Sequence, residues 1–158
     1  MTRVEYLCYT DGSCKASEGA PGGRGFRIEP PAGLPVEGYG KAIGTLAKIM
    51  EYQAVAEALS VLPDHAAVVV FSDNLPLVQN MTKNLDTWRQ SDFAKVDPLI
   101  AASVRRIAAC IHRRQIVVRW QWIRAHNGNA GNARADELAA QGAREAKKDL
   151  LTSLKRTR

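Results

Sequence analysis

Long apolar stretches are missing from this sequence. None of its apolar runs approaches the ~20 residues that a helix needs to cross a bilayer, and the first residues include no long apolar segment typical of a signal peptide. Cysteine is also scarce: Cys8, Cys14 and Cys110 lie far apart and form no Cys-x-x-Cys pair, which argues against a disulfide framework or a zinc knuckle. We therefore expect a cytoplasmic protein without a membrane partner.

Acidic residues are absent between Asp97 and Asp136, although the chain contains 16 of them against 22 lysines and arginines. Seven arginines occupy that segment: Arg105, Arg106, Arg113, Arg114, Arg119, Arg124 and Arg134. The C-terminus adds Lys147, Lys148, Lys155, Arg156 and Arg158. A concentrated basic region attracts polyanions such as nucleic acid. The alternative is a solvated helix face followed by a basic tail, with no specific partner.

The 158 residues are enough for one domain with a sizeable core. Hydrophobic residues make up 46% and charged residues 24% of the chain, a balance that excludes a disordered chain, a collagen and a coiled coil. We predict a domain over residues 1–148 and a basic C-terminal tail over residues 149–158.

The first part of the chain predicts an antiparallel meander. Strands are expected over residues 4–10, 26–28 and 36–43, with short loops rich in glycine and proline between them. Strands and helices then alternate: a helix over 46–62 capped by Thr45, a buried strand over 67–71, a helix from Pro76, a helix over 94–114, a strand over 116–123 and a helix over 132–148. This order predicts a mixed sheet with helices packed on it.

Four carboxylates are placed where packing alone does not require them. Asp11 and Asp73 close two predicted strands, Glu51 lies in the first helix, and Asp136 lies near the start of the last helix. If the two strands are neighbours, these carboxylates meet at one edge of the sheet. Clustered oxygen donors favour Mg²⁺ or Mn²⁺ over zinc. Taken singly, each carboxylate is also explained as a turn former, a helix cap or a surface charge.

Five short motifs carry a resemblance to a known family. They are Tyr9-Thr10-Asp11-Gly12-Ser13-Cys14, Pro21-Gly22-Gly23-Arg24-Gly25, Met50-Glu51, Ser72-Asp73-Asn74, and Trp120-Gln121-Trp122-Ile123-Arg124-Ala125-His126 followed by Asn132, Arg134 and Asp136. With these motifs in this order, residues 4–145 resemble a type 1 ribonuclease H. The resemblance implies the ribonuclease H-like α/β fold, which is a five-stranded mixed sheet with its first three strands antiparallel and helices on both faces.

The resemblance also implies roles for particular residues. Asp11, Glu51, Asp73 and Asp136 would be the catalytic carboxylates that hold two Mg²⁺ ions, for which Mn²⁺ can substitute, and Asp11 would bridge them. His126 would assist proton transfer or product departure. The substrate contacts would come from Gly12, Ser13, Cys14, Lys48, Asn74, Trp88, Asn132 and Arg134. Ala47 and Lys48 stand where family members often have asparagines, and a lysine can hold a phosphate but cannot accept a hydrogen bond.

The activity that the resemblance implies is endonucleolytic hydrolysis of the RNA strand of an RNA–DNA hybrid, by a monomer, leaving 5′-phosphate and 3′-hydroxyl ends. Two alternatives stay open. One is a nuclease of the same fold that acts on duplex RNA or branched DNA, and the other is a catalytically silent nucleic-acid-binding module. Among the aromatic residues, Trp120 and Trp122 are expected in the core because they alternate along a strand, whereas Trp88 fits packing and substrate stacking equally well.

Overall fold

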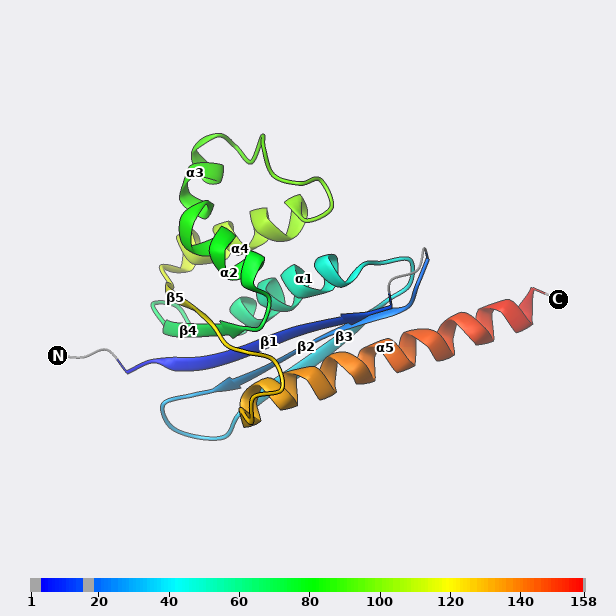
Figure 1. Ribbon diagram of the computed structural model, residues 1–158. Helices are drawn as coiled ribbons and strands as arrows, with labels where there is room; N and C mark the ends of the chain where they lie inside the picture. The colour runs from blue at the N-terminus through cyan, green and yellow to red at the C-terminus, as the bar shows by residue number, and fades with distance from the viewer. Residues whose placement is uncertain (1–3, 16–18, 158) are drawn as a thin grey trace.

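The computed structural model describes residues 4–15 and 19–157 (Figure 1). Its elements are β1 (Tyr6–Cys14), β2 (Gly22–Glu29), β3 (Val36–Ala42), α1 (Ala47–Ser60), β4 (Ala67–Ser72), α2 (Leu75–Lys83), α3 (Leu85–Gln90), α4 (Ala101–Arg114), β5 (Val117–Trp122) and α5 (Ala130–Arg156). The strands form one sheet in the order β3-β2-β1-β4-β5. β1 to β3 pair antiparallel, whereas β4 is parallel to β1 and to β5. The predicted fold class is confirmed.

Helices cover both faces of the sheet. The α1–α4 group lies on one face and α5 lies alone on the other, projecting beyond the sheet at its C-terminal end (Figure 1). Most of the apolar core fills the space beneath α1 and α4, where Val68 and Val70 of β4 pack with Leu59 and Ile107. Burial on both faces explains why β4 reads as a continuous apolar run in the sequence.

A glycine brings α5 into backbone contact with the sheet. A β-carbon added at Gly23 of β2 would lie 2.0 Å from the carbonyl oxygen of Ala139 in α5. No side chain fits in that space, so only glycine allows the helix to lie this close to the strand. The Gly-rich segment predicted as a loop is therefore the beginning of β2, which starts at Gly22.

The predicted cap of the first helix is wrong. α1 begins at Ala47 with Leu46 as its N-cap, and no side chain caps it. The backbone N–H of Thr45 donates instead to the carbonyl of Ala20. A β-carbon at Gly22 would lie 2.6 Å from the Thr45 methyl group. Thr45 is thus held against the start of β2, and its buried hydroxyl has no partner among the described residues.

Two helix boundaries also differ from the prediction. α4 begins at Ala101 rather than near residue 94, because the carboxylate of Asp97 accepts a bond from the N–H of Leu99 across Pro98, forming a turn. α5 continues through Arg156 rather than ending near residue 148, and Lys41 of β3 supports it through an ion pair of 2.6 Å to Asp149. Arg158 of the predicted tail lies outside the described residues. Within residues 4–15 and 19–157, no helix combines the length and the apolar character that spanning a membrane requires.

The contact between α5 and β2 can be tested with Gly23→Ala. We expect the free energy of unfolding to fall by about 3 kcal/mol or more, since the added methyl group meets backbone atoms that cannot move independently. Gly44→Ala is the matched control: its φ is +70° and nothing lies within 4 Å of the added carbon, so its cost is the conformational one of about 1 kcal/mol. Urea unfolding measures both, and equal losses would contradict the close packing.

Candidate active site

Three carboxylates from three different elements converge in one pocket. Asp11 comes from β1, Glu51 from α1 and Asp73 from the residue after β4. Each offers one oxygen that lies within 4.8 Å of the oxygens offered by the other two. Three of the four predicted carboxylates therefore lie together as a candidate ligand set, and their role as metal ligands stays a prediction.

The register of two parallel strands places Asp11 and Asp73 together. Tyr9 of β1 pairs with Phe71 of β4, and their rings stack with centroids 4.8 Å apart. Each ring precedes a carboxylate by two residues, and side chains two residues apart along a strand point to the same side. The stacked pair therefore brings Asp11 and Asp73 to the same level and the same side of the sheet.

Gly12 brings Glu51 to the other two carboxylates. A β-carbon at Gly12 would lie 2.6 Å from the backbone nitrogen of Glu51, so α1 can approach β1 this closely only over a glycine. The N–H of Gly12 also donates to Oδ1 of Asp11 at 2.9 Å. Gly12 was predicted as a substrate contact. Its position shows that it also builds the pocket, while the substrate contact stays a prediction.

Burial makes negative charge on the carboxylates of this pocket unfavourable. Asp11 is 5% exposed and Glu51 8% exposed. Burial, reinforced by the charge of Asp73, raises the pKa of Asp11 to about 7. Burial, reinforced by the charge of Asp11, raises the pKa of Glu51 to about 10. Oε2 of Glu51 is buried without a hydrogen-bond partner among the described residues. Unpaired buried carboxylate oxygens of this kind are satisfied by a cation.

Asp136 and His126 lie on the other side of Asp73. A cavity of about 90 Å³ is lined by Asp73, His126, Asp136 and Asn132, together with residues 127–129 and Ala133. Asp136 is exposed and is not one of the three converging carboxylates, although its proximity contributes to raising the pKa of both Asp11 and Asp73. The positive φ of His126, 56°, turns the chain into this cavity wall. Of the five predicted catalytic residues, three share the buried pocket and two line the adjoining cavity.

Two predicted substrate residues also hold the local structure. The side chain of Asn74 caps α2 by accepting from the N–H of Leu77 at 3.0 Å. Asn132 is buried, and its side chain lowers the pKa of Asp73 against the dominant effect of burial. Asn129, which the sequence analysis did not select, caps α5 by accepting from the N–H of Asn132 at 2.8 Å. An asparagine just before a helix is the signal that could have identified it.

Trp122 does not lie where the sequence predicts it. It was predicted in the core with Trp120, but it is 40% exposed while Trp120 packs against the core. Its indole Nε1–H donates to the backbone carbonyl of Asp73 at 3.2 Å. The reason is its place at the end of β5, an edge strand, where it pairs with Ser72 directly before Asp73. The pairing of β4 with β5 was the missing information.

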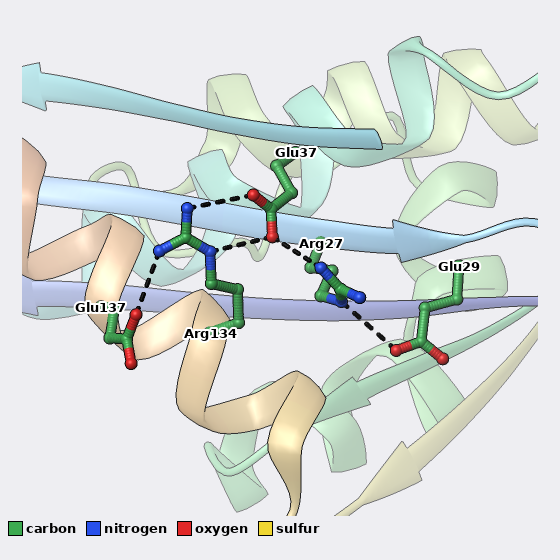
Figure 2. Close-up of polar contacts among 5 residues, drawn as sticks. All are labelled: Arg27, Glu29, Glu37, Arg134 and Glu137. Carbon is green, nitrogen blue, oxygen red and sulfur yellow. Dashed lines mark hydrogen bonds and ion pairs between the residues drawn. The ribbon is translucent and has the colours of Figure 1, made fainter. Parts of the chain in front are cut away.

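Lys48 and Arg134, the two basic residues predicted to contact substrate, each form an ion pair with a carboxylate. Nζ of Lys48 lies 2.6 Å from Oδ2 of Asp97. Lys48 lines a cavity of about 350 Å³ that also includes Glu51, Asn74 and Asn80. Arg134 of α5 is bound to Glu37 and Glu137 (Figure 2). Lys48 therefore lies beside the carboxylate pocket, while the guanidinium of Arg134 is held by β3.

The remaining predicted substrate residues lie in two places. Ser13 and Cys14 continue β1 beyond Asp11 and line a cavity of about 490 Å³ against α5, and the thiol of Cys14 donates to the carbonyl of Thr45 at 3.3 Å. Trp88 of α3 packs partly buried against the core. Packing accounts for Trp88, and its contact with substrate stays a prediction.

The sheet order and the carboxylates from β1, α1 and β4 define an α/β protein of the ribonuclease H-like class with a candidate metal site. The sequence profile of the family described as RNase H matches residues 3–144. The chain belongs to the ribonuclease H family of enzymes, and the type 1 resemblance is confirmed.

Individual relatives agree with this assignment. The chain is 34% identical over 148 residues to the ribonuclease H of Methylorubrum extorquens (strain PA1), covering 92% of this chain and 63% of that protein. It is 33% identical over 143 residues to the ribonuclease H of Polaromonas naphthalenivorans (strain CJ2), covering 89% and 88%.

Solved structures share the fold. LC9-RNase H1, a type 1 RNase H, superposes with a TM-score of 0.78 at 23% identity, covering 92% of this chain and 75% of that chain. LC11-RNase H1, solved in complex with an RNA/DNA hybrid, gives a TM-score of 0.69 at 24% identity, covering 90% and 99%.

The raised pKa values predict how stability depends on pH and Mg²⁺. Asp11 and Glu51 bind protons more tightly in the folded protein than at their ordinary pKa values of 3.8 and 4.5. The metal-free folded state therefore holds more protons than the unfolded chain up to about pH 7 at Asp11 and up to about pH 10 at Glu51, so these two groups make the free energy of unfolding fall as pH rises. A bound cation removes this loss by replacing the protons.

Thermal melting at pH 5 and pH 8, in chelator and in Mg²⁺, measures this effect. We expect Mg²⁺ to raise the melting temperature more at pH 8 than at pH 5. Glu51→Gln, which removes one buried charge, should flatten the pH dependence in chelator and reduce the gain from Mg²⁺. An equal gain at the two pH values would contradict competition between protons and metal.

Proposed function

We propose that this protein is a metal-dependent endoribonuclease that hydrolyses the RNA strand of RNA–DNA hybrids with two Mg²⁺ ions, leaving 5′-phosphate and 3′-hydroxyl ends. The observation that carries the proposal is the convergence of Asp11, Glu51 and Asp73 in one buried pocket, with Asp136 across the adjoining cavity. The RNA/DNA hybrid in the complex of LC11-RNase H1, a protein of the same fold, supports the choice of substrate.

The donor set fits Mg²⁺ and Mn²⁺. All candidate ligand atoms are carboxylate oxygens, without the nitrogen and sulfur donors that favour zinc. The raised pKa values of Asp11 and Glu51, caused first by burial, mean that a divalent cation would stabilise their charged forms. When bound by these carboxylates, a pair of ions would supply an activated water and charge stabilisation at the leaving oxygen. Asp11 is the central ligand of this proposal because it is near each of the other carboxylates.

The surrounding side chains hold the carboxylates in place. Asn132 favours the charged form of Asp73, and Trp122 holds the backbone of the same residue through its indole N–H. His126, in the wall of the same cavity, is assigned the proton transfer to the departing 3′ oxygen, because an imidazole ring can both donate and accept a proton.

Selection of the RNA strand requires contacts to 2′-hydroxyl groups. We assign these contacts to the turn region of β1, through Gly12, Ser13 and Cys14, and to Asn74 beside Glu51. Lys48 is assigned a backbone phosphate on the same side of the pocket. The protein is proposed to act as a monomer in the cytoplasm, where its three free cysteines stay reduced.

A second candidate is a nuclease of the same fold with a broader substrate range, including duplex RNA or branched DNA. The observation that favours it is Lys48, which donates to Asp97 at 2.6 Å. An ammonium group binds a phosphate of any strand and has no acceptor for a 2′-hydroxyl or a base edge. Cleavage of labelled hybrid, duplex RNA, single-stranded RNA, duplex DNA and branched DNA in Mg²⁺, Mn²⁺ or chelator distinguishes the two candidates.

Asp73→Asn is expected to abolish cleavage without abolishing binding. The carboxylate serves the metal and not the phosphate contacts, so we expect the cleavage rate to fall on the order of 1,000-fold, equivalent to about 4 kcal/mol of activation free energy. Asp86→Asn, which changes an exposed carboxylate of α3 in the same way, is the control and should cleave normally. Unchanged cleavage by Asp73→Asn, measured at saturating Mg²⁺, would remove Asp73 from the site.

Binding of the hybrid should weaken steeply as salt increases. Each phosphate neutralised by lysine or arginine releases condensed counterions, giving a slope of about −0.9 per contact for a DNA duplex when the logarithm of the binding constant is plotted against that of the salt concentration. Fluorescence anisotropy with the Asp73→Asn variant measures this slope without cleavage. A flat response would show that the basic residues do not grip the nucleic acid.

A further inference from the structure

An ion-pair network joins β2, β3 and α5 (Figure 2). Nε of Arg134 lies 2.9 Å from Oε2 of Glu37 and its Nη2 lies 3.0 Å from Oε1, so the two side chains form a bidentate pair. Nη1 of Arg134 donates to Glu137 at 3.0 Å. Glu37 also accepts from Arg27 at 2.8 Å, and Arg27 donates to Glu29 at 3.3 Å.

All three guanidinium nitrogens of Arg134 are therefore committed to carboxylates. Nη1 and Nη2 each keep one further N–H, but the Nε–Nη2 edge is filled by Glu37, so a phosphate could take that edge only by displacing Glu37. The family resemblance implied that Arg134 contacts substrate, but its contacts in the structure indicate another task.

The position of Arg134 in α5 indicates a structural role. Arg134 lies two residues after Asn132, which supports Asp73, and two residues before Asp136. The carboxylate of Asp136 interacts with the carboxyl group of Asp11, and it has no ion-pair partner among the described residues. Its position therefore depends on how α5 is rotated about its own axis.

Packing of α5 on the sheet limits this rotation, since Leu138 lies against Gly25 and Gly131 lies against the ring of Tyr9. Gly23 allows α5 to approach β2 closely, but it has no side chain that could interlock with the helix. A bidentate arginine–carboxylate pair restricts rotation further, because two parallel hydrogen bonds define an orientation as well as a distance. Glu37 anchors this pair to β3 and is itself held by Arg27 of β2.

We propose that the Glu37–Arg134 pair sets the rotation of α5, so that Asp136 and Asn132 face Asp11 and Asp73. Arg134 is thus a positioning residue rather than a phosphate ligand. A misplacement of about 1 Å can cost on the order of 100-fold in rate, and loss of a residue that supports a metal ligand costs about 10- to 100-fold in metal affinity. The kinetic part of this inference rests on the proposed function.

The chain offers a matched control for the pair. Three alternate residues of β3 contact α5: Glu37 bonds to Arg134, Tyr39 to Glu145 at 3.0 Å, and Lys41 to Asp149 at 2.6 Å. The last pair also joins β3 to α5 but lies 13 residues beyond Asp136 in the sequence. Asp149→Asn therefore breaks an ion pair between the same two elements away from the site.

Binding of Mn²⁺ to the protein without substrate is the first test. Calorimetric titration should show affinity weaker by about tenfold for Glu37→Gln and for Arg134→Lys, which keeps the charge but loses the bidentate geometry. Asp149→Asn should bind Mn²⁺ like the unmodified protein. Unchanged Mn²⁺ affinity in Glu37→Gln and Arg134→Lys, or an equal loss in Asp149→Asn, would overturn the proposal.

Cleavage of RNA–DNA hybrid separates positioning from phosphate binding. If Arg134 positions the helix, Glu37→Gln and Arg134→Lys should both lower kcat by about tenfold at a fixed Mg²⁺ concentration, with KM for the hybrid within about twofold. If Arg134 were a phosphate ligand, Arg134→Lys would raise KM at constant kcat, and Glu37→Gln would lower KM by freeing the guanidinium. The second pattern would overturn the proposal.

The experiments distinguish failure of the proposed function from failure of the proposed positioning role. If the unmodified protein did not cleave the hybrid, the proposed function would be wrong, while the Mn²⁺ titration would still decide whether Glu37 and Arg134 position the carboxylates. If the protein cleaves the hybrid and the Mn²⁺ affinities are all equal, only the positioning role is wrong.

Discussion

The burial of Asp11 and Glu51 beside Asp73 is the constraint on which the rest of the structure depends. Three carboxylates share one buried pocket, and burial raises the pKa of each. Such a cluster is unfavourable for the metal-free fold, so the surrounding structure must hold it together. The stacked Tyr9–Phe71 pair aligns two of the strands. Packing of the surrounding elements thus offsets the cost of burying these carboxylates, whose charged forms favour a cation.

Backbone contact on both faces of the sheet makes this convergence possible. Gly12 lets α1 approach β1 from one face, and Gly23 lets α5 approach β2 from the other. Larger residues at these positions would move the helices outward, and with them Glu51 and Asp136. The two glycines therefore belong to the active site through geometry, although neither supplies a ligand atom. This explains why the site draws donors from elements far apart in the sequence.

The sequence predicts the parts of the site that follow from local patterns and from the family motifs. Asp11 and Asp73 stand at strand ends and could be placed at one edge of a sheet before the structure was known. Trp122 could not be placed, because its exposure depends on β5 being an edge strand that pairs with β4. The partner of Arg134 was equally hidden, since Glu37 lies 97 residues away in the chain. Strand alternation and helix propensity carry no information about such pairings.

Lys48 and Arg134, the two basic residues expected to contact substrate, differ in how readily their ion pairs can be exchanged for a phosphate. Lys48 holds Asp97 through one exposed ion pair, and exposed pairs contribute about 0–1 kcal/mol. Exchange of that carboxylate for a phosphate is therefore nearly neutral, which leaves Lys48 available beside Glu51. To offer its Nε–Nη2 edge to a phosphate, Arg134 would have to break a bidentate pair that Arg27 reinforces. The two residues carry the same charge, but the ion pair of Lys48 suits the exchangeable phosphate contact proposed for it, whereas the pairs of Arg134 suit the proposed fixed contact that positions Asp136.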